Sequence, residues 1–189
     1  MRHRWLAVLA LIAFWVGFSQ QERGIRFGQL NIDFEQLTSI QHRKDKTIML
    51  EVRGSANNPV VVDSPDQNFR MRTLRLQGVL AQNEQGQMRL QSAAAIGRVE
   101  FFYERKEPFT RLNATANRAD YDDKEQKVTL SGDVSVDSED EFYRVRWRNN
   151  ERVVVYLGEE SLRVEAEGKL QGGQRRGEMT ITSKQQTAR

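Results

Sequence analysis

The chain has 189 residues, with 29 Lys and Arg against 26 Asp and Glu, and it contains no cysteine. This length can bury one sizeable core and favours a single domain. The lack of cysteine excludes a disulfide framework, a thiol nucleophile and a lipoprotein anchor. The two charge signs are mixed along the chain, so the concentrated positive footprint of a nucleic-acid binder is absent, and we expect no nucleic-acid partner.

The first 19 residues have the pattern of an export signal. Arg2 and Arg4 precede an uncharged apolar run over residues 5–18, and small residues follow up to Ser19. The run is shorter than the about 20 residues that span a bilayer. We therefore expect residues 1–19 to be a signal peptide cut after Ser19, with an uncleaved inner-membrane anchor as the alternative.

Residues 20–45 match no pattern and stay unassigned. Beyond them, apolar residues alternate with polar ones or occur in short runs that Gly, Asn, Asp and Pro separate, which is typical of short β-strands. The sequence thus predicts an all-β domain over residues 46–182 and a polar tail over residues 183–189. The expected strands cover residues 48–52, 60–62, 69–76, 99–103, 128–136, 143–147, 153–157, 162–166 and 179–181.

The stretch RADYDDKEQKVTLSGDVSV (118–136) predicts a turn, a strand, a kink and a second strand. Its acidic start is turn chemistry. Its apolar residues, from Val128 to Val136, share one parity, as in a half-buried strand. Gly132 keeps that parity without a side chain, which predicts a β-bulge or the close approach of another backbone.

An internal repeat supports a sheet that grows by hairpins. VVVDSPDQNFRMR (60–72) aligns without a gap on VSVDSEDEFYRVR (134–146), with seven identities in thirteen positions. Each copy reads as a strand, an Asp-Ser-x-Asp turn and a second strand with Arg at alternate positions. Such a unit cannot bury its own apolar face, so repeats of this kind stack.

NATANRADYDDKEQKVTLSGDVSV (113–136) resembles the signature of the OstA-like, or Lpt, family of lipopolysaccharide transport proteins. In that family an Ala-rich strand leads to a Tyr-Asp turn and then to a strand that ends Leu-x-Gly-x-Val. SAAAIGRVEFFYE (92–104) resembles the preceding family phrase. The matching residues of the first phrase are Ala116, Ala119, Tyr121, Asp122, Val128, Leu130, Gly132 and Val134.

This resemblance implies an open, twisted antiparallel β-jellyroll built from repeated strand-turn-strand units. It also implies a non-enzymatic periplasmic carrier whose apolar groove holds the acyl chains of lipopolysaccharide or a related glycolipid, without a cofactor or a metal. The implied protein partners are homologous β-jellyroll proteins, joined by edge-to-edge strand pairing into a bridge, and inner- and outer-membrane transport components. The expected edge strands of this chain are residues 48–52 and 178–182.

Two sets of residues are candidates for lipid contact. The first set shares the apolar face of the strands, and its alternative role is an ordinary sandwich core: Val99, Phe101, Tyr103, Val128, Leu130, Val134, Val136, Val145, Trp147, Val153 and Val155. The second set consists of arginines that suit phosphates of a head group, or else form a soluble outer face: Arg70, Arg72, Arg144 and Arg146.

An enzyme is disfavoured because the sequence shows no catalytic constellation. His42 is the one histidine outside the export signal, and it sits in a polar stretch. Asp120 and Asp122 read as turn formers rather than as a glycosidase pair. The alternative to a lipid carrier is therefore an envelope interaction module of the same fold, with a closed core and no lipid ligand.

Overall fold

The computed structural model of the chain describes residues 31–65, 68–82, 88–107, 109–157 and 162–184. The expected signal segment and its cleavage point lie outside the described residues, as does most of the expected polar tail. Thirteen strands form one antiparallel sheet in the described part. They are β1 (Asn31–Asp33), β2 (Gln36–His42), β3 (Thr47–Arg53), β4 (Val60–Ser64), β5 (Phe69–Thr73), β6 (Arg75–Gln82), β7 (Met88–Lys106), β8 (Phe109–Asp122), β9 (Lys127–Asp140), β10 (Tyr143–Leu157), β11 (Leu162–Gln171), β12 (Gln174–Arg176) and β13 (Glu178–Ser183).

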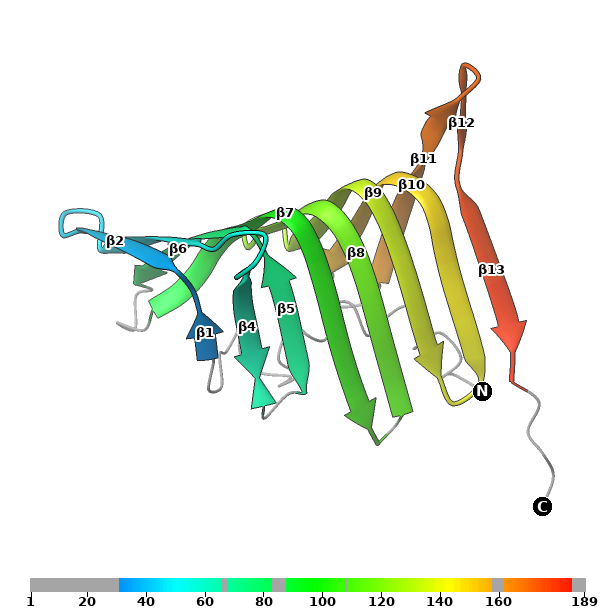
Figure 1. Cartoon of the computed structure of the whole chain (residues 1–189), viewed down its shortest axis with the longest axis horizontal. Helices are drawn as coiled ribbons and strands as arrows, with labels where there is room; N and C mark the ends of the chain where they lie inside the picture. Colours follow the sequence, from blue (N-terminus) through cyan, green and yellow to red (C-terminus); the bar gives the residue numbers. More distant parts are fainter. Residues whose placement is uncertain (1–30, 66–67, 83–87, 108, 158–161, 185–189) are drawn as a thin grey trace.

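The long strands bend, and their bends lie side by side along one line, which we call the crest (Figure 1). At the crest the pairing register shifts between β7 and β8, between β8 and β9, and between β9 and β10. Gly97, Gly132 and Asn149 adopt positive φ values of 83°, 72° and 58° there. Glycine and asparagine are the residues that tolerate this backbone conformation best.

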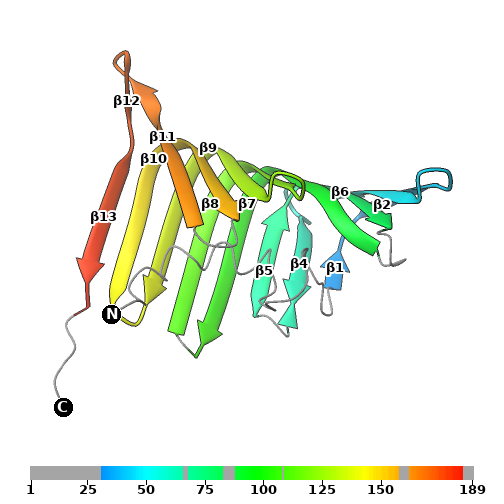
Figure 2. The same ribbon diagram turned by 180° about the vertical axis from the view of Figure 1, so that it is seen from behind.

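The crest divides the sheet into two facing walls, which Figure 2 shows from behind. The front wall pairs its strands in the order β1, β4, β5, β7, β8, β9, β10, β13. The back wall has the order β2, β3, β6, β7, β8, β9, β10, β11. Strands β7 to β10 belong to both walls, so each wall of the described structure contains eight strands.

Within the described residues, a strand pair leaves the walls at the C-terminal end of the crest. Strand β11 continues past Gly168 and pairs with β12, and the chain then returns as β13. Residues 169–176 thus form a two-stranded projection above the crest (Figure 1), which we call the ribbon.

The expected bulge at Gly132 is confirmed, and the reason is a close contact across the crest. A Cβ atom at this position would lie 2.9 Å from the Cβ of Asn117 in β8, which is closer than carbon atoms approach. The positive φ adds to the strain that a larger residue would suffer. Gly132 therefore allows β9 to turn from the back wall into the front wall.

The fold prediction is confirmed, with two corrections at the N-terminal side. The described sheet is all-β, antiparallel and open, but it begins at β1, ahead of the expected boundary at residue 46. Residues 48–52 are not an edge, because β3 lies between β2 and β6. Residues 178–182 do form an edge, since β13 pairs only with β10 among the described strands. The described residues contain no helix long and apolar enough to cross a membrane.

Candidate functional site

The space between the two walls is lined by one cluster of apolar side chains, which we call the interior. All eleven predicted lining residues belong to this cluster, and each is at most 8% exposed. Both walls contribute: Val134 and Val136 come from the front part of β9, and Val128 and Leu130 from its back part. The structure therefore brings together residues that the sequence grouped by parity alone.

The interior also contains residues that were not among the predicted lining set. Phe69 of β5 packs edge-on against Phe101 of β7, with ring centroids 4.8 Å apart. Alternation in the first repeat copy already marked such positions. The additional buried residues include Val60, Val62, Met71, Leu112, Ala114, Ala119 and Tyr121.

The interior is exposed at both ends of the sheet. At the C-terminal end, Met179 and Ile181 of β13 lie opposite Trp147 and Val145 and so continue their face, but they are 59% and 58% exposed. At the N-terminal end, Leu37 of β2 lies opposite the buried Val52 and is 50% exposed. An apolar face thus runs from one edge of the structure to the other and ends in uncovered side chains.

The indole of Trp147 brings a hydrogen-bond donor into this apolar face. Trp147 is 8% exposed, and its indole Nε1 has no hydrogen-bond partner among the described residues. A buried donor left without an acceptor costs about 1–3 kcal/mol. The indole N–H is therefore able to donate to an acceptor that a ligand brings into the interior.

Tyr121 and the acidic turn after it close the back end of the β8–β9 hairpin. The Tyr121 hydroxyl donates to Asp123 Oδ1 at 2.7 Å, and the Glu125 amide donates to Asp122 Oδ1 at 3.0 Å. Burial raises the pKa of the Tyr121 hydroxyl above its ordinary value, and the bond to Asp123 adds to the shift. The Tyr-Asp motif is thus a structural turn, in which the hydroxyl stays protonated and donating.

The four predicted head-group arginines lie on the outer face of the front wall, away from the interior. Each one faces an acidic residue on the neighbouring strand. The pairs are Arg70–Asp63 at 3.1 Å, Arg72–Glu100 at 4.0 Å, Arg144–Glu139 at 2.8 Å and Arg146–Asp137 at 3.5 Å. Their arrangement is a ladder of cross-strand ion pairs, so contact with a head group stays a prediction.

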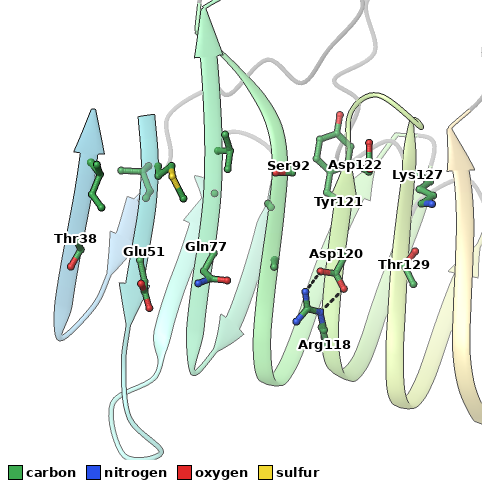
Figure 3. A pocket seen from close by; sticks show the side chains of 17 residues that line it. Thr38, Glu51, Gln77, Ser92, Arg118, Asp120, Tyr121, Asp122, Lys127 and Thr129 are labelled. Atoms are coloured by element: carbon green, nitrogen blue, oxygen red, sulfur yellow. Dashed lines mark hydrogen bonds and ion pairs between the residues drawn. The ribbon is translucent and has the colours of Figure 1, made fainter. Parts of the chain in front are cut away.

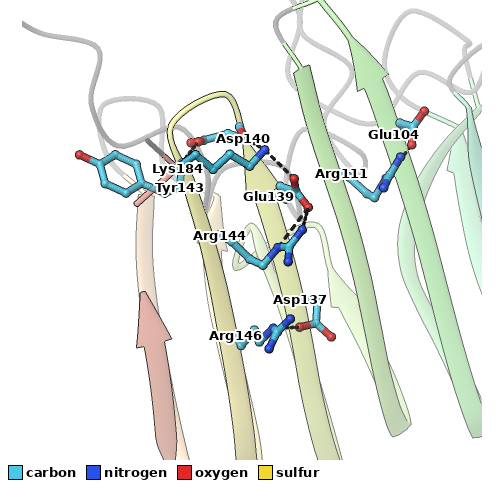
Figure 4. A network of polar contacts seen from close by, with 9 residues as sticks. All are labelled: Glu104, Arg111, Asp137, Glu139, Asp140, Tyr143, Arg144, Arg146 and Lys184. Carbon is cyan, nitrogen blue, oxygen red and sulfur yellow. Dashed lines mark hydrogen bonds and ion pairs between the residues drawn. The ribbon is translucent and has the colours of Figure 1, made fainter. Parts of the chain in front are cut away.

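Part of this ladder fastens the edge strand to the wall (Figure 4). Just after β13, Lys184 pairs with Glu139, and its Nζ donates to the Asp140 carbonyl oxygen at 2.7 Å. Arg144 also bonds Glu139. The hydrogen bond from Lys184, followed by that from Arg144, lowers the pKa of Glu139 below its ordinary value, against the opposing effect of burial.

We expect the Glu139→Gln variant to melt roughly 1–4 °C below the wild-type chain at pH 7. Because the folded state lowers the pKa of Glu139, its stabilisation is present above the ordinary carboxyl pKa and is lost as the pH falls below it. The melting temperatures of the variant and the wild-type chain should therefore become equal near about pH 3. A difference that stays constant down to that pH would contradict the ion-pair origin. In the double variant Glu139→Gln with Lys184→Met, the melting temperature should fall by less than the sum of the decreases in the two single variants.

A hollow lies on the outer face of the back wall (Figure 3). It encloses about 470 Å³ and has Ile40, Met49 and Val79 among its lining residues. The Arg118–Asp120 ion pair, at 2.6 Å, lies at its side. None of the eleven predicted lining residues borders this hollow, although Tyr121 of the interior does.

The described residues offer no group of three or more His, Cys, Asp or Glu side chains that could hold a metal ion. His42 is exposed at the end of β2. The chemistry of the described structure is therefore that of an apolar interior between charged outer faces.

Comparison with known proteins identifies relatives of this arrangement. The family model described as "LptA/(LptD N-terminal domain) LPS transport protein" matches residues 28–156. Among solved structures, one similar chain is LptH from Pseudomonas aeruginosa, described as the LptA homologous periplasmic component of the conserved lipopolysaccharide transport device. It is 16% identical, the match covers 82% of this chain and 95% of that one, and the TM-score is 0.50. No curated protein sequence matches the chain.

Proposed function

The chain belongs to the LptA/(LptD N-terminal domain) family of LPS transport proteins, and from this premise we propose that it is a non-enzymatic periplasmic carrier of lipopolysaccharide. The acyl chains occupy the interior, and the polar part of the lipid stays outside. The carrier passes the lipid along a bridge of homologous β-jellyrolls between inner- and outer-membrane components. An N-terminal signal, or an uncleaved anchor, directs the chain to this compartment.

The observation that carries this proposal is the apolar interior that runs from β2 to β13 and is exposed at both ends. Burial of each CH₂ group stabilises by about 0.8 kcal/mol, so a chain of about twelve carbons gains on the order of 10 kcal/mol. A continuous apolar lining provides this gain along the whole path. A lipid can then move from one end to the other without exposing its acyl chains to water.

Entry of an acyl chain requires the two walls to separate. Apart from β11–β12 in the ribbon, each described strand pair lies within one wall or continues from one wall into the other across the crest, where the chain joins the walls. Away from the crest, side-chain packing is what holds the described parts of the two walls together. When lipid enters, apolar contacts with the acyl chains replace apolar contacts between the walls. The separation of the walls therefore costs little free energy once the lipid is inside.

Trp147 is the residue best placed to contact an ester or hydroxyl group of the lipid. It lies near the exposed C-terminal end of the interior, opposite Met179, and its N–H lacks a partner in the described structure. An acceptor on the acyl chain would satisfy this donor. The interior would then hold the lipid at a defined position as well as bury its acyl chains.

The strand directions support assembly of copies in one orientation. Each wall has eight antiparallel strands in the described part of the chain, an even number, so the first described strand of a wall runs opposite to the last. A second copy placed beside the first in the same orientation therefore brings β1 antiparallel to β13 and β2 antiparallel to β11. Edge strands pair readily in this way.

We expect a photo-crosslinking amino acid at Leu130 or Trp147 to capture lipopolysaccharide in cells. Both positions lie in the interior, whereas the matched control positions Thr129 and Arg146 are their chain neighbours on the outer faces. The measurement is the attached lipid, detected on the purified chain after irradiation. Capture at the interior positions and not at the controls supports the carrier. Lack of lipid at both interior positions would favour the interaction module with a closed core.

A further inference from the structure

The ribbon is the one part of the described sheet that completes neither wall. In it, Lys169 lies opposite Arg176 and Leu170 opposite Arg175, and Gly172 begins the turn at the tip. Residues 169–176 include three basic side chains and no acidic one. Leu170 is 68% exposed, the highest value among the large apolar residues of the described structure. The ribbon thus presents positive charge and an apolar side chain to its surroundings.

The base of the ribbon is fixed to the crest. Gly168 and Gly177 cross so closely that a Cβ atom at Gly168 would lie 2.1 Å from the Gly177 backbone nitrogen. Lys169 forms an ion pair with Asp133, which lies beside the bend of β9. The crossing and the ion pair hold the direction of the ribbon relative to the walls, although an isolated two-stranded ribbon is only marginally stable.

The opposite end of the crest carries the complementary chemistry. There the chain passes from β1 to β2 through Phe34 and Glu35, directly after Asp33. All three are exposed, with Phe34 at 44%. Glu35 is held in place, because its amide donates to the Arg53 carbonyl at 3.0 Å and its carboxylate accepts from the Ser55 hydroxyl at 2.8 Å. We call residues 33–35 the acidic crest.

We propose that the ribbon of one copy of this chain binds the acidic crest of the next copy. The proposal rests on the edge-to-edge assembly described above. When β1 and β2 of a second copy lie beside β13 and β11, neighbouring strands are about 4.8 Å apart. The acidic crest of that copy then lies at the foot of the ribbon, within reach of arginine side chains.

Charges of opposite sign and apolar side chains lie on the two sides of this junction. Arg175 shares its face of the ribbon with Leu170 and already pairs with Glu167 at 2.9 Å. Arg176 lies on the other face, opposite Lys169, and has no acidic partner within ion-pair distance among the described residues; its guanidinium donates to the Gln174 side chain at 3.2 Å. Asp33 and Glu35 provide two carboxylates, and Leu170 provides an apolar contact for Phe34. Burial of two exposed apolar side chains against each other adds to the charge attraction.

This contact solves a problem that strand pairing leaves open. Antiparallel edges with exposed faces specify their register weakly, and a slip by two residues keeps the same side chains on each face. The ribbon and the acidic crest each occur at one place in the chain, so their contact selects one register and one orientation. Alignment of the interiors of successive copies depends on that register.

The test is charge reversal followed by compensation, read by sedimentation velocity of the purified chain over a range of concentrations. Arg175→Glu with Arg176→Glu should weaken self-association about tenfold, because attraction becomes repulsion. Adding Asp33→Arg and Glu35→Arg to the same chain should restore the dissociation constant to within about threefold. Arg98→Glu with Lys124→Glu makes the same change of net charge away from both edges, and should leave self-association unaltered.

The outcomes separate this inference from the proposed function. A wild-type chain that stays monomeric, unaltered association of the ribbon variant, or failure of the compensating substitutions would overturn the ribbon contact. Each variant is also titrated with a fluorescent fatty acid of twelve carbons. Binding of this probe by all variants leaves the carrier function intact in every one of those cases. Lack of probe binding by the wild-type chain would count against the carrier function. It would not affect the conclusion about the contact between the ribbon and the acidic crest.

Discussion

Leu130→Asp should weaken binding of a fluorescent twelve-carbon fatty acid by at least about tenfold, because it puts a charge into the apolar path. Leu130 is 4% exposed and lies in the interior, between its β8 neighbour Ala119 and its β10 neighbour Val153. An unpaired carboxylate that the bound acyl chain cuts off from water loses its hydration, which costs several kcal/mol. The measurements are a fluorescence titration and circular dichroism of the same samples.

Thr129→Asp is the matched control for this variant. Thr129 is the preceding residue of β9, and its side chain borders the outer hollow instead of the interior. We expect it to bind the fatty acid as the wild-type chain does. Equal loss of binding in both variants, with folding intact, would defeat the interior as the acyl site.

A second variant covers the case in which Leu130→Asp unfolds. Met179→Asp changes the same interior face at its exposed C-terminal end, where a charge costs little in the free chain. It should keep the fold and still weaken binding of the fatty acid. Unfolding of Leu130→Asp together with normal binding by Met179→Asp would support a closed core.

Ile181→Pro should abolish self-association while leaving the rest of the fold intact. The Lys184 amide donates to the Phe142 carbonyl at 2.7 Å, and these residues continue the register of β13 with β10. Antiparallel strands alternate between residues that bond the partner and residues that point away. The Ile181 N–H therefore points out of the sheet, and proline removes this donor and blocks the edge. Sedimentation velocity measures the loss.

Thr180→Pro is the informative comparison, because the same alternation turns the Thr180 N–H inward, toward Arg146 of β10. That substitution breaks the pairing of β13 with its own wall rather than the free edge. It should therefore lower thermal stability, whereas Ile181→Pro should not. Ile181→Ala keeps the outward N–H and controls for the lost side chain. Undiminished oligomers of Ile181→Pro would show that the chain assembles through another surface.

Local features of the fold could be predicted from the sequence because they depend on neighbouring residues. The two repeat copies form hairpins: β4 pairs with β5, and the second half of β9 pairs with β10. The bend at Gly132 was visible because glycine marks a bulge. The bends at Asn117 and Asn149 were not, since asparagine is also common in ordinary turns.

Features that depend on distant partners could not be predicted. Residues 36–42 are mostly polar, and Leu37 and Ile40, their two apolar residues, do not share the parity of a half-buried strand. The sequence therefore did not mark β2 as a strand, and β3 looked like an edge. The arginines were recognised as a face, but their acidic partners follow from a cross-strand register that the sequence does not contain. Their shared parity along the strands identified the residues of the interior. Only the fold shows that these residues come from two facing walls.

The regular spacing of the strands determines the length of the sheet along the crest. Eight strands per wall at about 4.8 Å each give one copy a length of roughly 38 Å along the direction in which copies join. In the proposed assembly, each further copy adds the same length and keeps the same direction, because the first and last described strands run in opposite directions. The distance that such an assembly spans is then set by the number of copies, and one gene product is enough to cover gaps of different widths.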